Sequence, residues 1–442
     1  MSVALANAEV GAALVEAREA FAAIRPKSRV VHERATAHLP GGNTRTGVFS
    51  EPFPVAWARG EGCRLWDEDG LGVVDFLGEA TAGVYGHNHP AIRRAIETQL
   101  GLGWNFGGHS ALEGELAGLL SARFPSLEKL RFCNSGSEAN MFAVQTARVM
   151  TGRPSVLGFG GCYHGGLLTF TAASNPLNVP FSTVVAPYND IERSAALIDA
   201  HADELACVIV EPMIGGGGCI AADADFLHML RERTTRHGIV LIFDEVMTSR
   251  LGPGGLQGEH GITPDLTTLG KYICGGMTAG AFGGRTALME RYDPRGSGPG
   301  QAVPLQHSGT YNNNVFSLRA GIAGLGEVFT IEAAAALNAR GERLRARLNE
   351  VCERADAALQ VTGIGSMLAF HARRGVIRTP ADAAAGNAAV RELLFYDLLA
   401  AGFYTMPRRG FMALSLPLGE AEFDGLVGAV AEFVSARASL LR

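Results

Sequence analysis

The chain has 442 residues, more than one ordinary domain of roughly 100–200 residues requires. With 47% hydrophobic and 19% charged residues, its composition is typical of a compact folded protein and excludes a disordered chain. The formal net charge is −6, and no basic patch with interleaved aromatic residues occurs, so we expect no nucleic-acid partner.

The N-terminal residues 1–21 are rich in alanine and carry Glu9, Glu16 and Glu19. A signal peptide would need a basic start followed by an apolar block, so this pattern predicts an amphipathic helix instead. We expect this helix to pack on a partner or on its own domain.

Residues 67–70 (DEDG) lie between two extended stretches, Cys63–Trp66 and Val73–Leu77, and predict a hairpin turn. A calcium loop would need further ligands that are missing here. His87 and His89 follow in the string GHNHP. Because no third ligand stands at helical spacing, they predict a loop-structuring role, and we expect no metal site.

The middle of the chain alternates between strand-like and helix-like segments. Leu205–Val210 and Ile239–Phe243 are short apolar runs, and Asp225–His237 between them predicts a helix. The order strand, helix, strand predicts a parallel sheet with helices on its faces. Ligands bind at the carboxyl ends of such strands. Three acidic residues directly follow the two runs: Glu211, Asp244 and Glu245.

The C-terminal part predicts two long helical stretches, Ile331–Ala358 and Asn387–Ala401. It also predicts a few short strands, among them Phe411–Leu416. We therefore predict an α/β protein with a large central domain over residues 76–320. A smaller α+β domain would combine residues 1–75 and 321–442.

Residues 132–140 (FCNSGSEAN) precede a helical run to Val149. Small hydroxyl and glycine residues that open a helix make a good anion site, because free backbone N–H groups and the positive end of the helix dipole face the ligand. An ordinary serine N-cap is the alternative interpretation.

Asp244 ends the most apolar strand of the chain and is followed by Glu245 and Val246. A carboxylate in that position is costly unless it meets a cation or hydrogen-bond donors. The alternative is a helix cap or a structural ion pair.

Lys271 lies in the string TTLGKYICGGM, which is apolar and rich in glycine. A P-loop is excluded, because no glycine stands five residues before Gly270 and because Tyr272 replaces the required Ser or Thr. Burial lowers the pKa of an amine and favours the neutral form that builds Schiff bases. The alternative is a solvated surface lysine.

Together, an anion site, a buried carboxylate and a desolvated lysine are the three groups that pyridoxal phosphate (PLP) needs, for its phosphate, its pyridine nitrogen and its aldehyde. The strings LIFDEVMTSR, PDLTTLGKYICGGM, NSGSEAN and YHGG also resemble class III aminotransferases of PLP fold type I. The chain is most similar to the β-amino acid aminotransferases that act on β-phenylalanine, which are relatives of glutamate-1-semialdehyde aminomutase. PGGNTRT, TAGVYGH, HSGTYNNNV and TGIGS extend the resemblance over nearly the whole chain.

The resemblance implies a large domain with a mostly parallel sheet and these cofactor contacts. Lys271 matches the Schiff-base lysine of the family, and Asp244 matches the carboxylate that keeps the pyridine nitrogen protonated. Val246 and Tyr163 would lie against the two faces of the ring. The phosphate loop matches three residues, the last of which stands where threonine is usual: Ser135, Gly136 and Ser137.

Thr310 matches the residue that reaches the phosphate of the neighbouring subunit, which implies a homodimer with shared active sites. Arg45 matches the anchor for the carboxylate of the β-amino acid, and bidentate pairing suits arginine to that role. Arg409 matches the arginine for the acceptor's carboxylate, although Arg408 beside it leaves the choice open. Ala80 stands where relatives often carry an aromatic residue, which predicts a larger or differently shaped side-chain pocket.

The function implied is transfer of an amino group from a β-phenylalanine-like donor to a 2-oxo acid such as 2-oxoglutarate or pyruvate. Lys271 would move the proton between the substrate carbon and the cofactor. Two other functions stay open: an aminomutase acting on glutamate 1-semialdehyde, and an inactive PLP-binding relative. The scattered cysteines form no C-x-x-C pair, and no run of about 18 apolar residues occurs, so we expect a cytoplasmic protein without a membrane partner.

Overall fold

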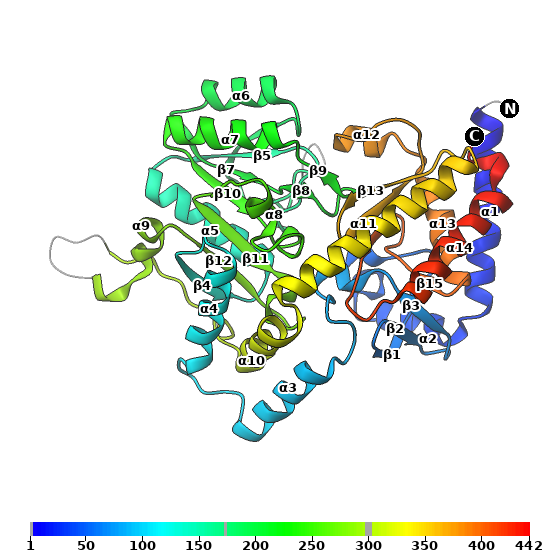
Figure 1. Ribbon diagram of the computed structural model, residues 1–442, viewed down its shortest axis with the longest axis horizontal. Helices are drawn as coiled ribbons and strands as arrows, with labels where there is room; N and C mark the ends of the chain where they lie inside the picture. The colour runs from blue at the N-terminus through cyan, green and yellow to red at the C-terminus, as the bar shows by residue number, and fades with distance from the viewer. Residues whose placement is uncertain (1–2, 172–174, 297–302) are drawn as a thin grey trace. The chain divides into compact units, whose positions relative to one another are not determined.

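The computed structural model describes residues 3–171, 175–296 and 303–442 (Figure 1). Two compact units make up the chain. The central unit comprises Pro90–Ala336 and Arg378–Pro380, and the end unit comprises Met1–His89, Leu337–Ile377 and Ala381–Arg442. The division into domains at 75/76 and 320/321 stays a prediction.

The central unit is built on a seven-stranded sheet in the order β4-β12-β11-β10-β7-β5-β6. Its strands are β4 (Lys129–Cys133), β5 (Ser155–Phe159), β6 (Ser182–Ala186), β7 (Leu205–Val210), β10 (Val240–Asp244), β11 (Leu266–Gly270) and β12 (Gly280–Gly284). Strands β11, β10, β7, β5 and β6 pair in parallel, whereas β12 is antiparallel to both β11 and β4. The mostly parallel sheet that the sequence predicted is confirmed.

Strands β7 and β10 are buried along their whole length, which requires cover on both faces of the sheet. Helix α5 (Gly136–Thr151) packs across β12, β11 and β7, and α7 (Ala224–His237) packs on β10 and β7. Helix α6 (Ile191–Ala200) lies beside α7, as Figure 1 shows. The predicted strand, helix and strand over residues 205–243 are therefore all present.

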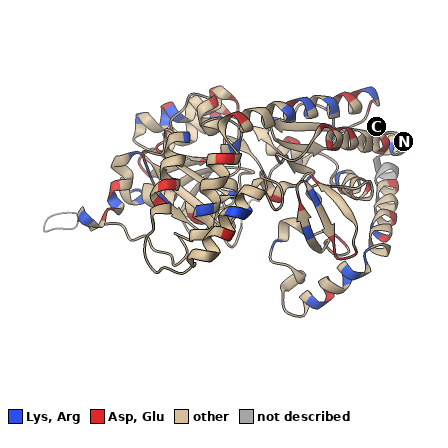
Figure 2. Cartoon of the chain, turned by 60° about the horizontal axis from the view of Figure 1, so that its bottom comes forward, with Lys and Arg blue, Asp and Glu red and all other residues tan. Residues whose placement is uncertain are grey.

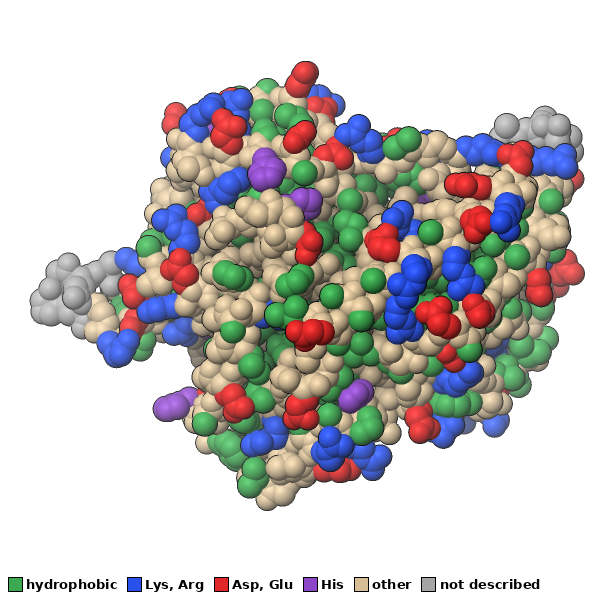
Figure 3. All heavy atoms as spheres, viewed as in Figure 1, with side chains coloured by type: hydrophobic (Ala, Val, Ile, Leu, Met, Phe, Trp, Pro, Cys, Tyr) green, Lys and Arg blue, Asp and Glu red, His purple; other side chains and the backbone are tan. Residues whose placement is uncertain are grey.

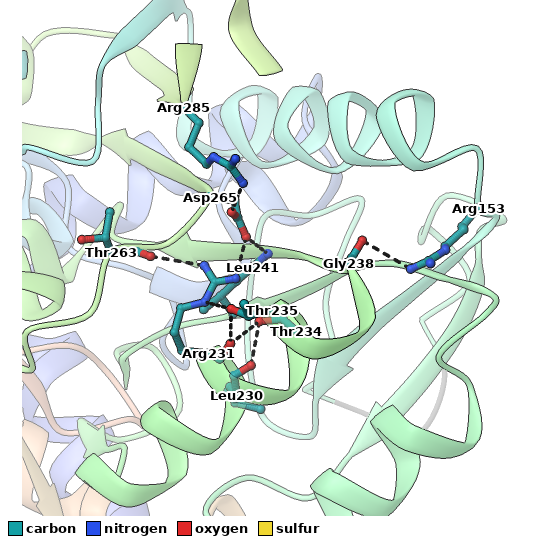
Figure 4. A network of polar contacts seen from close by, with 10 residues as sticks. All are labelled: Arg153, Leu230, Arg231, Thr234, Thr235, Gly238, Leu241, Thr263, Asp265 and Arg285. Carbon is teal, nitrogen blue, oxygen red and sulfur yellow. Dashed lines mark hydrogen bonds and ion pairs between the residues drawn. The ribbon is translucent and has the colours of Figure 1, made fainter. Parts of the chain in front are cut away.

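Asp265, directly before β11, fixes α7 to the sheet (Figure 4). Its buried carboxylate accepts hydrogen bonds from the Leu241 amide at 2.9 Å and from Arg231 of α7 at 3.0 Å, and Arg285 donates to its other oxygen at 3.0 Å. This network lies at the edge of the sheet where β11 begins, so the carboxyl ends of the parallel strands lie at the other edge.

The remaining helices and strands of the central unit are shorter or lie outside this sheet. They are α3 (Pro90–Leu102), α4 (Ala111–Arg123), β8 (Met213–Ile214), β9 (Ile220–Ala221), α8 (Gly255–Glu259), α9 (Thr286–Met289) and α10 (Val315–Ala323).

The end unit holds two small sheets, in the orders β1-β2-β3-β15 and β13-β14-β16. Their strands are β1 (Trp57–Glu61), β2 (Arg64–Asp67), β3 (Gly72–Asp75), β13 (Gln360–Ile364), β14 (Met367–His371), β15 (Phe403–Tyr404) and β16 (Phe411–Ala413). Its helices are α1 (Val3–Ala23), α2 (Pro26–Thr36), α13 (Ala388–Ala400) and α14 (Glu420–Ala436), together with most of α11 (Ile331–Arg354) and most of α12 (Pro380–Ala384).

The predicted hairpin over residues 63–77 is confirmed, because β2 and β3 pair antiparallel. Asp67 in its turn is buried and accepts a hydrogen bond from Arg25 at 3.0 Å. Asp69 accepts the first backbone N–H groups of α2, from Lys27 at 2.7 Å and Ser28 at 3.0 Å. The acidic turn thus caps a helix and satisfies its unpaired amides.

The helix predicted over residues 1–21 is α1, and residues 1 and 2 of the predicted segment lie outside the described part of the chain. It packs on α13 of its own unit and buries Val10, Leu14 and Phe21. Within the described residues, no single helix is both long and apolar enough to cross a membrane. One pair of consecutive helical segments, Val315–Val328 and Ile331–Arg354, has the required length and composition when taken together, but it is bent by 73°. Acidic and basic side chains are interspersed along the chain in Figure 2 and on the face drawn in Figure 3.

Candidate active site

The chemistry-bearing residues of the central unit gather where its parallel strands end. Glu211 follows β7, Asp244 ends β10 and Lys271 follows β11. Ser135 follows β4, which runs in the same direction as β11 because both are antiparallel to β12. The carboxyl ends of parallel strands form the usual ligand site of such sheets. The fold therefore brings the predicted lysine, the carboxylate and residues 135–137, called the anion loop below, to one edge.

Asp244 is 4% exposed and is held by several donors. Its Oδ2 atom accepts a hydrogen bond from Asn140 Nδ2 at 2.8 Å and lies 2.7 Å from His164 Nδ1. Its Oδ1 atom accepts the backbone N–H of Val246 at 3.0 Å. Thr268 fixes Asn140 in turn, by donating to its side-chain oxygen at 2.6 Å. These bonds set the orientation of a buried carboxylate.

Ser135 is the N-cap of α5, as the alternative interpretation of this loop predicted. Its Oγ accepts the Glu138 amide at 3.1 Å, and the hydrogen-bond ladder of the helix starts with Ala139 N–H to Ser135 O at 3.0 Å. The amides of Gly136 and Ser137 precede this ladder, so they point out of the helix start together with its positive dipole end. A serine cap and an anion site are therefore compatible in one loop.

Two glycines, Gly136 and Gly165, allow neighbouring segments of the site to pack closely. A Cβ atom at Gly136 would lie 2.6 Å from Val246 Cγ1, so the valine side chain rests on the start of α5. Gly165 has a φ of +113°, and a Cβ atom there would lie 2.4 Å from Ser137 Oγ. The segment that carries Tyr163 thus meets the loop that carries Ser137.

Lys271 begins a 3-10 turn, Lys271–Cys274, with a left-handed backbone φ of 60°. Left-handed conformations of bulky residues are costly and concentrate at functional sites. The lysine side chain is half-buried, and Tyr272, Ile273 and Cys274 behind it are fully buried. This setting differs from that of a solvated surface lysine.

Tyr163 is 50% exposed, and its backbone N–H donates to Glu211 Oε2 at 2.9 Å. Glu211 is buried and also accepts the Gly215 amide at 3.2 Å. Burial raises the pKa of Glu211 to about 7, with His164 opposing the shift and the charge of Asp244 adding to it. Glu211 therefore fixes the backbone of Tyr163 through this hydrogen bond.

Thr310 is exposed in the segment of residues 307–314, which is tied to the anion loop. Asn134 Nδ2 donates to Asn312 Oδ1 at 3.0 Å, and Asn312 Nδ2 lies 3.3 Å from His307 Nε2. Burial and the Arg131 charge lower the pKa of His307 to about 4. Asn134, the residue directly before Ser135, thus links the segment of Thr310 to the start of α5.

The remaining predicted residues belong to the end unit. Arg45 forms an ion pair with Glu79, and both side chains are exposed. Arg409 is also exposed, and its backbone N–H donates to Pro407 O at 2.7 Å. Ala80 is buried.

His87, in the same unit, binds Asp75 through Nε2 at 3.0 Å. This contact is the kind of loop-structuring bond that the sequence predicted. In the described part of the chain, no group of three or more His, Cys, Asp or Glu side chains is placed to hold a metal ion.

Sequence reasoning missed four residues: Asn140, His164, Glu79 and Asn312. Asn140 and His164 lie inside the strings NSGSEAN and YHGG, but neither string shows that both side chains bind Asp244. Asn312 lies inside TYNNN, and Glu79 directly precedes Ala80. The sequence shows that these four side chains are polar, but it does not show which residues they contact.

The residues of this edge fit PLP. Lys271 supplies an amine, Asp244 supplies a carboxylate fixed by donors, and the start of α5 supplies amides for a phosphate. Any larger side chain at Gly136 would collide with Val246, so this helix start requires glycine. The fold and site define a PLP-dependent enzyme of fold type I.

Comparison with known proteins gives the family. Residues 47–402 match the class III aminotransferases, and the chain belongs to this family. It is 49% identical to β-phenylalanine transaminase of Variovorax paradoxus over 437 residues, 99% of each chain. It is 38% identical to glutamate-1-semialdehyde 2,1-aminomutase of Bordetella avium, over 85% of this chain and 90% of that one.

Solved structures agree. The crystal structure of the β-phenylalanine aminotransferase from Variovorax paradoxus superposes with a TM-score of 0.95, covering 98% of this chain and 99% of that one at 49% identity. An ω-transaminase from Sphaerobacter thermophilus gives a TM-score of 0.86 at 37% identity, over 92% of this chain and 97% of that one. The chain is a PLP-dependent aminotransferase.

Proposed function

We propose that this aminotransferase moves the amino group of a β-amino acid of the β-phenylalanine type to a 2-oxo acid such as 2-oxoglutarate or pyruvate. The observation that carries the proposal is the 49% identity to β-phenylalanine transaminase over 99% of both chains. The arrangement of Lys271, Asp244 and the anion loop supports it, because these residues supply the groups that transamination needs.

PLP, when bound, supplies an electron-poor ring that accepts charge from the reacting carbon. Lys271 would hold the aldehyde of the cofactor covalently and, once released, its Nζ atom would take the proton from the amine-bearing carbon of the donor. Asp244, oriented by Asn140 and His164, would keep the pyridine nitrogen protonated. A positioned base and a fixed counter-charge thus act in one reaction.

The amides of Gly136 and Ser137, with the hydroxyl of Ser137, would bind the phosphate. Ser135 would position these amides as the N-cap of α5. Tyr163 and Val246 would pack against the two faces of the ring. The hydrogen bond from Tyr163 N–H to Glu211 supports this placement, because it fixes the tyrosine backbone.

Arg45 would bind the carboxylate of the β-amino acid through its planar guanidinium. Arg409 would bind the carboxylate of the 2-oxo acid, with Arg408 as the alternative for that role. Ala80 would leave room beside the side chain of the donor.

We further propose a cytoplasmic homodimer in which Thr310 reaches the phosphate of the partner subunit. Support comes from four exposed apolar residues: Leu100, Leu102, Trp104 and Phe106. Asn313 joins their segment to that of Thr310 by donating to Gly108 O at 2.8 Å. Contiguous exposed apolar side chains mark interaction surfaces. The seven cysteines are buried and unpaired by disulfides, which supports a reducing compartment.

The test is a reaction of the purified holoenzyme with β-phenylalanine and 2-oxoglutarate. We expect glutamate to form, and we expect Lys271→Ala to abolish turnover and the absorption band of the lysine-bound cofactor. Absence of glutamate together with conversion of glutamate 1-semialdehyde would overturn the proposal in favour of an aminomutase. A wild-type protein without any cofactor band would instead indicate an inactive relative.

A further inference from the structure

The guanidinium of Arg45 already has a carboxylate partner in the structure, that of Glu79. The two side chains are 48% and 58% exposed, so solvent and solutes reach both. An arginine proposed to anchor a substrate carboxylate is therefore occupied by a carboxylate of its own chain.

The backbone holds Glu79 in an unusual conformation. Glu79, Ala80 and Thr81 have successive φ angles of 46°, 50° and 85°, all in the left-handed region. Residues other than glycine in this region are strained, and such strain persists only where the surroundings enforce it. Ala80 and Thr81 are buried, whereas Glu79 between Gly78 and Ala80 is exposed. The strained segment thus presents one side chain to solvent, and that side chain meets Arg45.

Asp75 holds the start of this segment. Its Oδ1 atom accepts the amides of Leu77 at 2.8 Å and Gly78 at 3.1 Å, and its Oδ2 atom lies 3.0 Å from His87 Nε2. Tyr404 lies close to the same charges. Burial raises the pKa of its phenol, the charges of Asp75 and Glu79 raise that pKa further, and the charge of Arg45 lowers it. The backbone that carries Glu79 is therefore held by buried hydrogen-bonded groups next to the Glu79–Arg45 pair.

We propose that Glu79 is a specificity-determining residue that occupies the Arg45 guanidinium until a substrate carboxylate displaces it. The inference rests on the proposed function, in which Arg45 binds that carboxylate. A carboxylate ligand must compete with Glu79, whereas an amine without a carboxylate leaves the pair intact and Arg45 neutralised. Glu79 therefore lowers the affinity for carboxylates and lets the enzyme tolerate amines that lack one.

The size of the effect follows from the exposure of the pair. Exposed ion pairs contribute little, so we expect their loss to change affinity by about two- to five-fold. The ratio of kcat/KM for β-phenylalanine over 1-phenylethylamine should shift further than either value alone, because the two substrates respond in opposite directions.

The experiment measures binding of 3-phenylpropanoate, which has the carboxylate but lacks the amine, to the holoenzyme by calorimetry. Glu79→Gln should bind it about two- to five-fold more tightly than wild type, while the affinity for the uncharged 3-phenylpropanamide should not change. Glu79→Asp keeps the charge, tolerates the left-handed backbone and should fall between the two. Glu61→Gln, which removes a charge from the exposed pair with Arg59, serves as the matched control and should bind like wild type.

Arg45→Ala separates the two possible failures. If it binds 3-phenylpropanoate as well as wild type does, the carboxylate anchor lies elsewhere, and the proposed donor assignment fails together with this inference. If Arg45→Ala weakens binding but Glu79→Gln and Glu79→Asp bind no more tightly than wild type, only the role of Glu79 is overturned. Circular dichroism of each variant checks that its fold is kept.

Discussion

Asp244 shows how a single residue acquires its setting. The sequence predicted that a carboxylate after so apolar a strand needs a cation or donors, and the structure supplies donors from Asn140, His164 and the Val246 amide. A buried carboxylate bonded in this way keeps one orientation. This is the property that a counter-charge for a bound heterocycle requires.

Glu211 gives a prediction for pH dependence. Its pKa is raised from the ordinary 4.5 to about 7, so the folded protein retains a proton that the unfolded chain has lost. The resulting stability is fully present below about pH 4.5 and is lost as the pH rises through about 7. Glu211→Gln removes this titration, so its melting temperature should fall less than that of wild type between pH 5 and pH 8.

Melting curves at intervals of one pH unit test this expectation. Glu232→Gln, on the exposed face of α7, is the control and should follow the wild-type profile. An unchanged pH profile in Glu211→Gln would contradict the assigned protonation of this carboxyl.

At the scale of elements, local pattern identified β7, β10 and α7 but gave no sign of β12. The residues of β12, GAFGG, have low strand propensity because glycine gains little from side-chain packing. The strand forms because it pairs along its whole length with β11 on one side and β4 on the other. It thereby sets the direction of β4 and brings the anion loop to the edge that holds Lys271.

Asp265 gives a prediction for the packing of α7. Asp265→Ala leaves the Leu241 amide and Arg231 without their carboxylate, and we expect it to destabilise the protein by about 2–3 kcal/mol. Urea unfolding followed by circular dichroism measures this change. Asp293→Asn, which affects a surface pair with Arg295, should stay within about 0.5 kcal/mol of wild type. A similarly small effect of Asp265→Ala would show that the helix is held by apolar packing alone.

At the scale of the whole molecule, the exposed apolar side chains after α3 are not buried by the fold of a single chain. Trp104 and Phe106 are 54% and 52% exposed, and the Trp104 ring lies 6.4 Å from that of Phe316 on α10. Aromatic residues are enriched in the buried centres of protein interfaces. This surface is the one on which the proposed homodimer depends.

Trp104→Glu should therefore weaken the dimer. Light scattering coupled to gel filtration should show a shift from the mass of two chains towards the mass of one, since a charge would be buried in the interface. Val149→Glu, at an equally exposed apolar position on α5, is the control and should leave the mass unchanged. A dimer that persists in Trp104→Glu at low micromolar concentration would place the interface elsewhere.

Local sequence was enough for the cofactor class, because PLP needs an amine, a carboxylate and an anion loop, and each has a short signature. Lys271 after one strand, Asp244 at the end of another and Ser135–Ser137 at a helix start carry these signatures. Parallel strands end at the same edge of a sheet, so the predicted strand, helix and strand over residues 205–243 already placed Glu211 and Asp244 at one edge. The pairing of β12 with β11 and β4, which the sequence did not predict, brought residues 135–137 to that edge as well.

Tertiary structure alone decided which side chains pair. Asn140 and His164 reach Asp244 from 104 and 80 residues away, and Glu79 reaches Arg45 across 34 residues. A hydrogen bond or an ion pair depends on distances of a few ångströms, which hydrophobic patterning does not specify. The sequence therefore determined the groups that the chemistry uses, whereas the fold determined how Asp244 is oriented and what Arg45 holds before a substrate arrives.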